Sequence, residues 1–321
     1  MKRPGIVLLD AETLGEAAGG YYSLTKLGNL TVYQFTPPEL RTERIHGKEI
    51  VITNKVVINR EVMDACPSLK LICVAATGMN NVDLDYAFSK DIAVKNVAGY
   101  STESVVQHTF SMLFYLMNHT RYYDEYVKQG DYASSHLFTH HGKPFPELAG
   151  KIFGIIGMGT IGKRVASVAS AFGAEVRYHS TSGKNRNAGF RHVSLDELLS
   201  ASDILSIHCP LNETTQDLIG YEQLRKMKKG ALLVNTGRGG IINESDLACA
   251  LNENLIGGAA LDVMQKEPPE KSNPLFHIEN PEKLLITPHI AWASIESRER
   301  LMQGIAGNIA AYLQNQQAGS I

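Results

Sequence analysis

The amino-acid sequence predicts an α/β protein of two domains, each built around a doubly wound parallel sheet. Its 321 residues exceed what one hydrophobic core usually serves and fall short of three domains. Short apolar runs alternate with segments of helical periodicity along most of the chain. No internal repeat or low-complexity tract interrupts this alternation, which excludes solenoids and disordered modules.

The N-terminal part of the chain predicts the smaller α/β unit. Its expected strands are short apolar runs, each separated from the next by enough residues for a helix or a crossover. They cover residues 6–9, 30–35, 51–53, 71–75 and 92–95. Apolar positions then recur with helical spacing over residues 102–118, which predicts a long buried helix.

A second and stronger series of strands and helices begins at Lys151. Six apolar runs predict its strands, at residues 152–156, 175–178, 204–208, 232–235, 259–261 and 284–286. Two helix starts support this prediction, because Ser194 and Glu197 form a capping-box pattern and Asn243 precedes an acidic first turn. A final amphipathic helix is expected over residues 294–314.

Charge and cysteine content exclude several classes of partner. Lys and Arg total 31 against 33 Asp and Glu, a net charge of −2, so neither nucleic acid nor a membrane surface is an expected partner. No signal peptide or transmembrane helix is apparent, so a cytoplasmic location is expected. Four cysteines lack any metal-ligand spacing, so we expect no metal and interpret them as small core residues in a reducing compartment: Cys66, Cys73, Cys209 and Cys249.

The run IFGIIGMGTIG combines an apolar strand, a glycine-rich turn and the start of a helix. Gly157 permits the tight turn, Gly159 lets the backbone approach a pyrophosphate, and Gly162 allows close packing of helix and strand. The helix that begins at Thr160 and Ile161 offers free amides and a partial positive charge to the phosphates. This context favours a dinucleotide site over an unrelated glycine-rich turn.

The cofactor is NAD(H) or NADP(H), and the sequence leaves this choice open. An acidic residue usually receives the ribose hydroxyls about 20 residues after the motif begins. This chain instead has the sequence YHSTSGKNR, which contains no acid. The hydroxyls of Ser180, Thr181 and Ser182, with Lys184 and Arg186 nearby, suit a 2′-phosphate. Alternatively, the two cations are merely solvated charges of a surface loop.

Three residues at the ends of successive late strands offer the chemistry that reduction of a 2-keto acid needs. Arg238, between glycines, presents a planar fork that suits a carboxylate. His289 can donate a proton to the carbonyl oxygen, and Glu267, beside two prolines, can hold the imidazole charged. We expect the three to converge, because carboxyl ends of parallel strands form the ligand-binding edge. Other histidines are rivals for the acid on residue type alone: His108, His136 and His208.

These segments resemble a known family over nearly the whole chain. TGRGG at residues 236–240, DVMQKEP at 262–268 and TPHIA at 287–291 look like the three signature segments of D-isomer-specific 2-hydroxy acid dehydrogenases. The resemblance implies that Arg238 binds substrate, and that Glu267 pairs with His289 as the acid/base.

The resemblance also implies a split architecture. A Rossmann-type dinucleotide-binding domain, residues 101–293, is inserted into a smaller flavodoxin-like substrate domain formed by residues 1–100 and 294–321. The sequence ATGMNNVD resembles the family's substrate loop, with Ala76 and Asn80 replacing the usual glycine and acid. The substrate-binding residues that this implies are Thr77, Gly78, Met79 and Tyr100.

A narrower resemblance indicates a branch of the family. AGYSTESVVQHT at residues 98–109 and AWAS at 291–294 look most like glycerate dehydrogenases, also called hydroxypyruvate reductases. By the same analogy Asp262 holds the nicotinamide carboxamide. Further cofactor contacts implied are Ser104, His208, Cys209, Pro210, Thr236 and Gly237.

The precise function stays open at this level. The substrate is a small 2-keto or D-2-hydroxy acid such as hydroxypyruvate or D-glycerate, while lactate-like, branched-chain and aromatic acids fit the same residues. Transcriptional corepressors that sense the dinucleotide share the fold, although the intact catalytic trio argues against that function. By resemblance, the Tyr- and His-rich stretch 119–150 embraces a second subunit in a homodimer.

Overall fold

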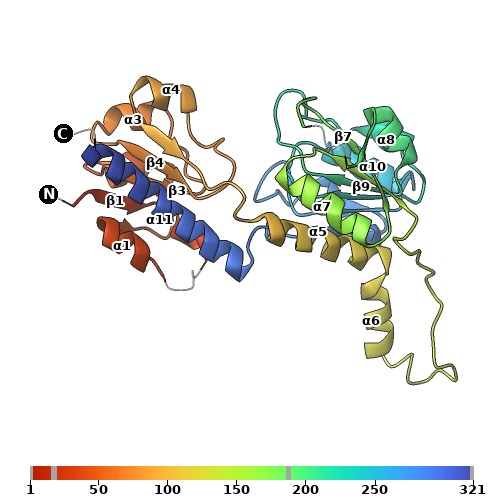
Figure 1. The fold of residues 1–321 in the computed structure, drawn as a ribbon. Coiled ribbons are helices and arrows are strands. Elements are labelled where there is room, and N and C mark those ends of the chain that lie inside the picture. The colour runs from red at the N-terminus through yellow and green to blue at the C-terminus, as the bar shows by residue number, and fades with distance from the viewer. Residues whose placement is uncertain (1–2, 16–19, 186–188, 319–321) are drawn as a thin grey trace. The chain divides into compact units, whose positions relative to one another are not determined.

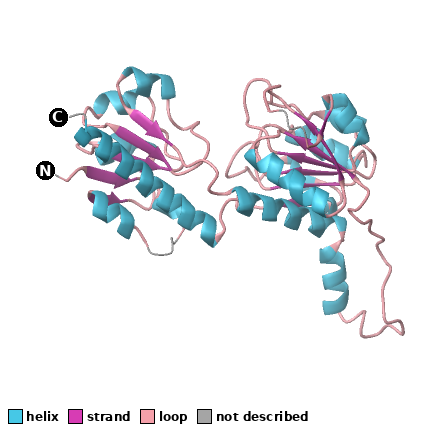
Figure 2. Cartoon of the chain, in the orientation of Figure 1, coloured by secondary structure: helices cyan, strands magenta, loops and turns pink. Residues whose placement is uncertain are grey.

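A computed structural model describes residues 3–15, 20–185 and 189–318 of the chain. The chain divides into two compact units, one formed by Met1–Ser101 with Ala293–Ile321 and the other by Thr102–Trp292. Each unit contains one parallel sheet with helices packed on it (Figures 1 and 2). The predicted α/β class is therefore confirmed for both units.

The first unit contains a five-stranded parallel sheet in the order β2-β1-β3-β4-β5. Every residue of β3 and β4, two of the three inner strands, is buried, as expected for strands covered on both faces. The strands are β1 (Gly5–Leu8), β2 (Asn29–Val32), β3 (Ile50–Thr53), β4 (Leu71–Val74) and β5 (Ala93–Lys95). Each of the five apolar runs predicted as a strand overlaps one of them.

One long helix and several short ones cover this sheet (Figure 1). Helix α11 (Ile295–Ala318) packs against β4 and against α1 (Tyr22–Leu27), and it buries Leu301, Ile305 and Ile309 at helical spacing. The predicted amphipathic C-terminal helix is thus confirmed. The shorter elements are η1 (Ala11–Leu14), η2 (Pro38–Leu40), α2 (Arg41–Ile45), α3 (Arg60–Ala65) and α4 (Leu84–Ser89).

The second unit contains a seven-stranded parallel sheet in the order β12-β11-β10-β9-β6-β7-β8. The chain starts at β6, extends to β7 and β8 on one side, and then returns to build β9 to β12 on the other. This reversal creates the switch point at which doubly wound sheets bind ligands. The strands are β6 (Ile152–Ile156), β7 (Glu175–His179), β8 (Arg191–His192), β9 (Ile204–Ile207), β10 (Leu232–Asn235), β11 (Gly258–Leu261) and β12 (Leu284–Ile286).

Helix α5 (Thr102–Met117) is the buried helix that the sequence predicts, and it packs against β10, β11 and α7. The other helices of the unit are α6 (Thr120–Lys128), α7 (Thr160–Ala171), α8 (Leu195–Ala201), α9 (Tyr221–Lys226), α10 (Glu244–Asn252), η3 (Pro274–His277) and η4 (Pro281–Lys283). No helix of the described chain combines the length and the apolar character needed to cross a bilayer.

Some local predictions need correction. The Ser194 hydroxyl accepts a hydrogen bond from the Glu197 amide at 3.1 Å, but the Glu197 carboxylate pairs with Arg191 at 2.7 Å, so the capping box is only half formed. Strand β8 has two exposed residues and helix α6 buries none of its residues, and the sequence analysis predicted neither element. The expected cap at Asn243 is confirmed, because its side chain accepts from the Asp246 amide at 3.1 Å.

The cysteines are all free thiols, and three of the four are buried as predicted. Burial raises the pKa of Cys73 to about 12 and that of Cys209 to about 11, so both stay protonated and unreactive. The prediction was wrong for Cys249, which is exposed on α10. Its position among apolar neighbours in the sequence reflects the helix, whose opposite face is buried.

Candidate active site

The glycine-rich turn follows β6 and opens helix α7. Gly157 has a φ of +96°, and a Cβ placed there would lie 2.6 Å from the backbone nitrogen of Cys209. A Cβ on Gly162 would lie 2.0 Å from the carbonyl oxygen of Gly157, so helix and strand require glycine for their contact. A Cβ on Gly159 would meet nothing within 4 Å. The turn is therefore closed toward the sheet and open at the α7 N-terminus, which fits a pyrophosphate.

The loop after β7 carries the hydroxyl groups predicted to receive the cofactor ribose. Ser180 is buried, and its carbonyl accepts from the Gly183 amide at 3.2 Å. The Ser182 hydroxyl accepts from the amide of Lys184 at 3.3 Å, and the Lys184 side chain is exposed. Arg186 lies outside the described residues. The described part of this loop offers donors and one cation but no carboxylate.

Arg238 lies in the loop after β10, and a buried asparagine fixes that loop. The Asn235 amide nitrogen donates to the Arg238 carbonyl at 2.9 Å, and its oxygen accepts from the Gly237 amide at 3.0 Å. A Cβ on Gly239 would lie 1.8 Å from the Met264 carbonyl oxygen, so this loop presses against the next one. The Arg238 guanidinium is half-buried and donates to the Gly237 carbonyl at 2.8 Å.

Glu267 and His289 form a hydrogen-bonded pair across the next two loops. The His289 Nδ1 atom lies 2.6 Å from Glu267 Oε2, and the two side chains are 27% and 32% exposed. The other carboxylate oxygen, Oε1, accepts from the Met264 amide at 3.0 Å. His289 has a φ of +54°, and its amide donates to the Asp262 carbonyl at 2.9 Å. The pair occupies Nδ1 of the imidazole and leaves Nε2 for other chemistry.

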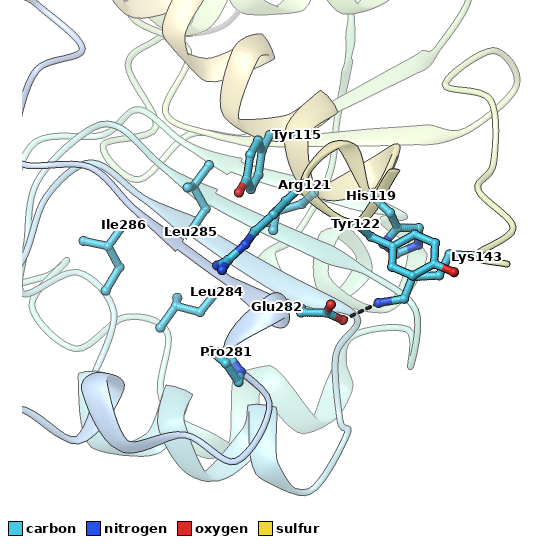
Figure 3. Close-up of a pocket in the computed structure, with 11 residues that line it drawn as sticks. Tyr115, His119, Arg121, Tyr122, Lys143, Pro281, Glu282, Leu284, Leu285 and Ile286 are labelled. Atoms are coloured by element: carbon cyan, nitrogen blue, oxygen red, sulfur yellow. Dashed lines mark hydrogen bonds and ion pairs between the residues drawn. The ribbon is translucent and has the colours of Figure 1, made fainter. Parts of the chain in front are cut away.

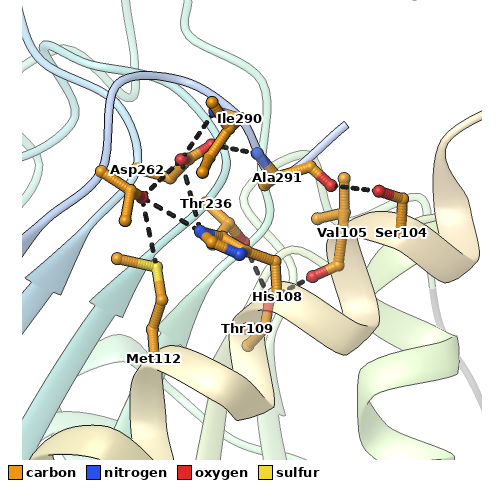
Figure 4. A network of polar contacts seen from close by, with 10 residues as sticks. Ser104, Val105, His108, Thr109, Met112, Thr236, Asp262, Ile290 and Ala291 are labelled. Atoms are coloured by element: carbon orange, nitrogen blue, oxygen red, sulfur yellow. Dashed lines mark hydrogen bonds and ion pairs between the residues drawn. The ribbon is translucent and has the colours of Figure 1, made fainter. Parts of the chain in front are cut away.

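Asp262 organises the turn that carries His289 (Figure 4). Its carboxylate is 1% exposed and accepts from the Thr287 hydroxyl at 2.6 Å and from the amides of Ile290 and Ala291 at 2.9 and 2.8 Å. Burial alone raises the pKa of Asp262, but hydrogen bonds from His108, Thr287 and the two amides outweigh it and lower the pKa. Both oxygens are therefore engaged within the protein, whereas the resemblance gives Asp262 to the nicotinamide carboxamide.

One face of α5 contacts the loops that carry Arg238 and His289 (Figure 4). Ser104 donates to the Ala291 carbonyl at 2.6 Å, and His108 Nε2 lies 3.0 Å from the Thr287 hydroxyl. The Thr109 hydroxyl lies 3.0 Å from that of Thr236. The predicted residues Ser104 and Thr236 thus belong to one buried polar network, which sequence reasoning did not connect.

Two of the rival histidines lack the environment of His289, whereas His108 also lies beside a carboxylate, with Nε2 3.5 Å from Asp262 Oδ1. Burial lowers the pKa of His208 to about 3, so its imidazole is neutral near pH 7 and does not supply the imidazolium that acts as the acid. The backbone of His208 packs with that of Cys209 against Gly157, and the Pro210 carbonyl accepts from the Thr215 hydroxyl at 2.7 Å. His136 is exposed, far in sequence from any of the strand ends.

The predicted substrate loop follows β4 in the first unit. Thr77 is exposed, Gly78 and Met79 are half-buried, and the Asn96 side chain donates to the Thr77 carbonyl at 2.6 Å. Tyr100 is buried. Residues that sequence reasoning missed brace both segments. Asn81 donates to the Val56 carbonyl at 3.1 Å, and Arg300 donates to that of Tyr100 at 2.8 Å.

A separate pocket lies beside α5, α6 and β12 (Figure 3). Its two basic side chains are already paired, Arg121 with Glu125 at 2.7 Å and Lys143 with Glu282. It contains none of the residues predicted for the catalytic or cofactor site. The described residues also include no cluster of His, Cys, Asp and Glu suited to a metal ion.

Comparison with known proteins gives a consistent result. Residues 110–291 match the model of the D-isomer specific 2-hydroxyacid dehydrogenase NAD binding domain. A putative 2-hydroxyacid dehydrogenase of Haemophilus influenzae is 42% identical, over 88% of this chain and 90% of that protein. The hydroxypyruvate reductase of Blautia hydrogenotrophica is 38% identical over 96% of each chain, and the glycerate dehydrogenase of Methylorubrum extorquens is 38% identical over 87% of each.

The solved structures agree. An acyclic imino acid reductase in complex with NADPH and D-Arg has a TM-score of 0.87 and 30% identity over 97% of each chain. The D-lactate dehydrogenase of Aquifex aeolicus, complexed with NAD and lactic acid, has a TM-score of 0.84 and 26% identity over 98% of this chain and 96% of that one. The chain therefore belongs to the D-isomer specific 2-hydroxyacid dehydrogenase family, in its glycerate dehydrogenase and hydroxypyruvate reductase branch, and is an NAD(P)-dependent oxidoreductase.

Proposed function

We propose that the enzyme interconverts a short, polar 2-keto acid and its D-2-hydroxy acid, with hydroxypyruvate and D-glycerate as the pair. The observation that carries this proposal is the contact of 2.6 Å between His289 and Glu267, one loop away from Arg238. Relatives named hydroxypyruvate reductase, glycerate dehydrogenase and glyoxylate reductase, at 35 to 38% identity, support a small substrate.

The residues have separate roles in the proposed reaction. Arg238 binds the substrate carboxylate with its guanidinium fork. His289 protonates the C2 oxygen as charge develops there, and Glu267 stabilises the imidazolium from the Nδ1 side. When bound, the nicotinamide supplies the hydride for C2. Thr77, Gly78, Met79 and Tyr100 are the proposed substrate-binding residues of the first unit, which is the proposed substrate domain.

The second unit is the proposed dinucleotide domain. We assign the diphosphate to the turn around Gly159 and the adenosine ribose to the loop of Ser180, Thr181, Ser182 and Lys184. Because this loop lacks an acid and carries a cation, NADPH should serve at least as well as NADH. Further proposed cofactor contacts are Gly157, Thr160, Ile161, Gly162, Ser104, His208, Cys209, Pro210, Thr236, Gly237 and Asp262.

A cofactor-oxidation assay over a panel of 2-keto acids tests the proposal. Hydroxypyruvate and glyoxylate should give a higher kcat/KM than pyruvate, branched-chain and aromatic acids. His289→Asn should lower kcat for reduction by roughly a hundredfold or more, because general acid catalysis is typically worth that much. A larger kcat/KM for a bulky apolar acid would contradict the substrate assignment, and an unaffected His289→Asn variant would contradict the acid assignment.

We also propose a cytoplasmic homodimer. Four free thiols, three of them buried, suit a reducing compartment. In the stretch 119–150 the ring of Tyr126 stacks on His140 with centroids 3.9 Å apart, while Phe138 is 91% exposed and Phe145 and Leu137 are also exposed. Such an apolar arm suits burial against a second copy. Sedimentation should give the mass of a dimer, and Phe138→Asp should shift it toward the monomer.

A further inference from the structure

The loop that carries Glu267 needs an anchor of its own. Between β11 and η3 it has no helix or strand, and residues 265–268 are exposed. Glu267 itself hydrogen-bonds to the Met264 amide at 3.0 Å, so its position depends on where residues 264 and 265 are held. Packing against Gly239 limits the approach of this backbone from one side. A hydrogen bond from a second element must therefore hold the backbone of residues 264 and 265 in place.

Glu244, the first residue of α10, makes that contact. Its Oε1 atom accepts from the Gln265 amide at 2.6 Å, and its Oε2 atom accepts from the Asn273 side-chain amide at 2.6 Å. The residue is 8% exposed, so these partners replace water at a carboxylate. The two bonds hold the start and the end of the loop around Glu267.

Capping of α10 does not account for Glu244. Asn243 already caps the helix through the Asp246 amide at 3.1 Å. Both Glu244 oxygens instead bind groups 21 and 29 residues further along the chain. The Asn273 amide cannot simply turn over, because its oxygen accepts from the Leu275 amide at 3.0 Å. The site therefore requires a side chain that accepts twice and donates nothing, which at this length is a glutamate.

We propose that Glu244 is a positioning residue, which sets the distance between Glu267 and His289 by holding the 264–273 loop. This inference rests on the proposed role of the Glu267 and His289 pair in proton transfer. Displacing that loop lengthens a contact of 2.6 Å, and charge stabilisation of the imidazolium falls with distance. Glu244 touches neither substrate nor cofactor in this account.

A donor swap tests the proposal. Glu244→Gln puts an N–H group against either the Gln265 amide or the Asn273 side-chain amide, both of which are donors. We therefore expect kcat for reduction to fall about tenfold, with KM for the keto acid within about twofold of the wild type. Asn273→Asp puts a carboxylate against Glu244 and should have a similar effect. In the double variant, the introduced glutamine donates to the introduced aspartate while still accepting from the Gln265 amide, so kcat should recover to within about threefold of the wild type.

The pH profile separates positioning from general destabilisation. Each single variant should move the alkaline limb of the reductive rate to lower pH, and the double variant should restore it. Glu253→Gln is the matched control, because it replaces the carboxylate at the C-terminal end of α10, which accepts a hydrogen bond from Tyr221 at 2.5 Å. It should leave both kcat and the limb unchanged. Melting temperatures measured on all variants report any shared loss of stability.

Three outcomes would overturn the inference. These are single variants with wild-type pH profiles, a double variant no better than either single one, or a Glu253→Gln control that moves the limb equally. Glu267→Gln in the same assay distinguishes the two levels of proposal. If it leaves the rate and the limb unchanged, the proposed acid pair fails, whereas an effect of Glu267→Gln without one of Glu244→Gln rejects only the role of Glu244.

Discussion

The loops after β10, β11 and β12 differ sharply from the loop after β7, although all lie at carboxyl ends of the same sheet. Each of the first three is held by a buried polar side chain, respectively Asn235, Glu244 and Asp262, at 1%, 8% and 1% exposure. In the loop after β7 the described contacts are two local hydrogen bonds, and Lys184 is exposed. In the proposed assignment, the loops that carry the reacting groups are therefore held by buried side chains with long-range hydrogen bonds, whereas the described part of the loop assigned to the adenosine ribose has only local ones.

The largest effect is expected at Arg238, whose loop is held by Asn235. Arg238→Lys keeps the charge but loses the planar fork, so kcat/KM should fall by about a hundredfold, or about 3 kcal/mol. The braced loop around Asn235 has little freedom to adapt to the shorter head group. Steady-state kinetics tests this, with Arg225→Lys on the exposed face of α9 as a control that should change nothing. Kinetics unchanged by Arg238→Lys would remove this arginine from the site.

Asp262 holds the turn that carries His289, and removing its charge should lower the free energy of unfolding by an amount that depends on pH. Because the folded protein lowers the pKa of Asp262, ionised Asp262 stabilises the fold at pH values above its pKa in the unfolded chain, about 4, and this contribution disappears as the pH falls through the pKa of the folded protein. Asp262→Asn should therefore cost about 2 kcal/mol of unfolding free energy at pH 7, with the difference shrinking below about pH 4. Urea unfolding at both pH values measures this.

The exposed Asp196 provides the control, since its Lys226 partner is also on the surface. Asp196→Asn should change the unfolding free energy by less than about 0.5 kcal/mol at either pH. An Asp262→Asn variant that resembles it would mean that the carboxylate does not hold the turn.

The proposed catalytic residues could be selected from the sequence, but the side chains that brace their loops could not. Arg238, Glu267 and His289 follow three consecutive strands, and the sequence predicts both the strands and the chemistry at their ends. Glu244 reads in sequence as an ordinary acid in the first turn of a helix, and nothing local indicates its Asn273 partner 29 residues away. Such a pairing depends on how two loops pack against each other, and loop packing leaves no periodic pattern in the sequence.

The structure also separates histidines that residue type alone left as equal candidates for the acid. His208 and His289 both follow strands. Burial lowers the pKa of His208 to about 3, whereas His289 has Glu267 Oε2 at 2.6 Å from its Nδ1 atom. Conversely, the prediction that the segment after β7 accepts a 2′-phosphate depends on the absence of an acid, which the sequence alone shows. A burial pattern depends on tertiary structure, whereas an absent residue type can be seen in the chain itself.

A smaller effect is expected at the Glu267 and His289 pair itself. Glu267→Gln keeps the shape and the hydrogen bond but removes the charge that stabilises the imidazolium. Reduction should then fail at a lower pH, with a loss of about tenfold, or about 1.4 kcal/mol, on the alkaline side, while the rate in mild acid changes less. The pH dependence of kcat/KM measures this. Glu270→Gln, on the same loop but paired with Lys266 in solvent, should leave the profile unchanged.

The smallest effect is expected in the loop after β7. Ser180→Asp supplies the acid that the sequence lacks, so it should accept the ribose hydroxyls of NADH and repel a 2′-phosphate. The ratio of kcat/KM for NADPH over NADH should fall about fivefold, or about 1 kcal/mol, with kcat on NADH within about twofold. Lys184→Ala should weaken NADPH alone, because the lysine is exposed and contributes only charge. Its effect should shrink as salt is raised. A wild-type enzyme that strongly prefers NADH would contradict the assignment, and a collapse of kcat in Ser180→Asp would show that this loop is as tightly coupled to the reaction as the three braced ones.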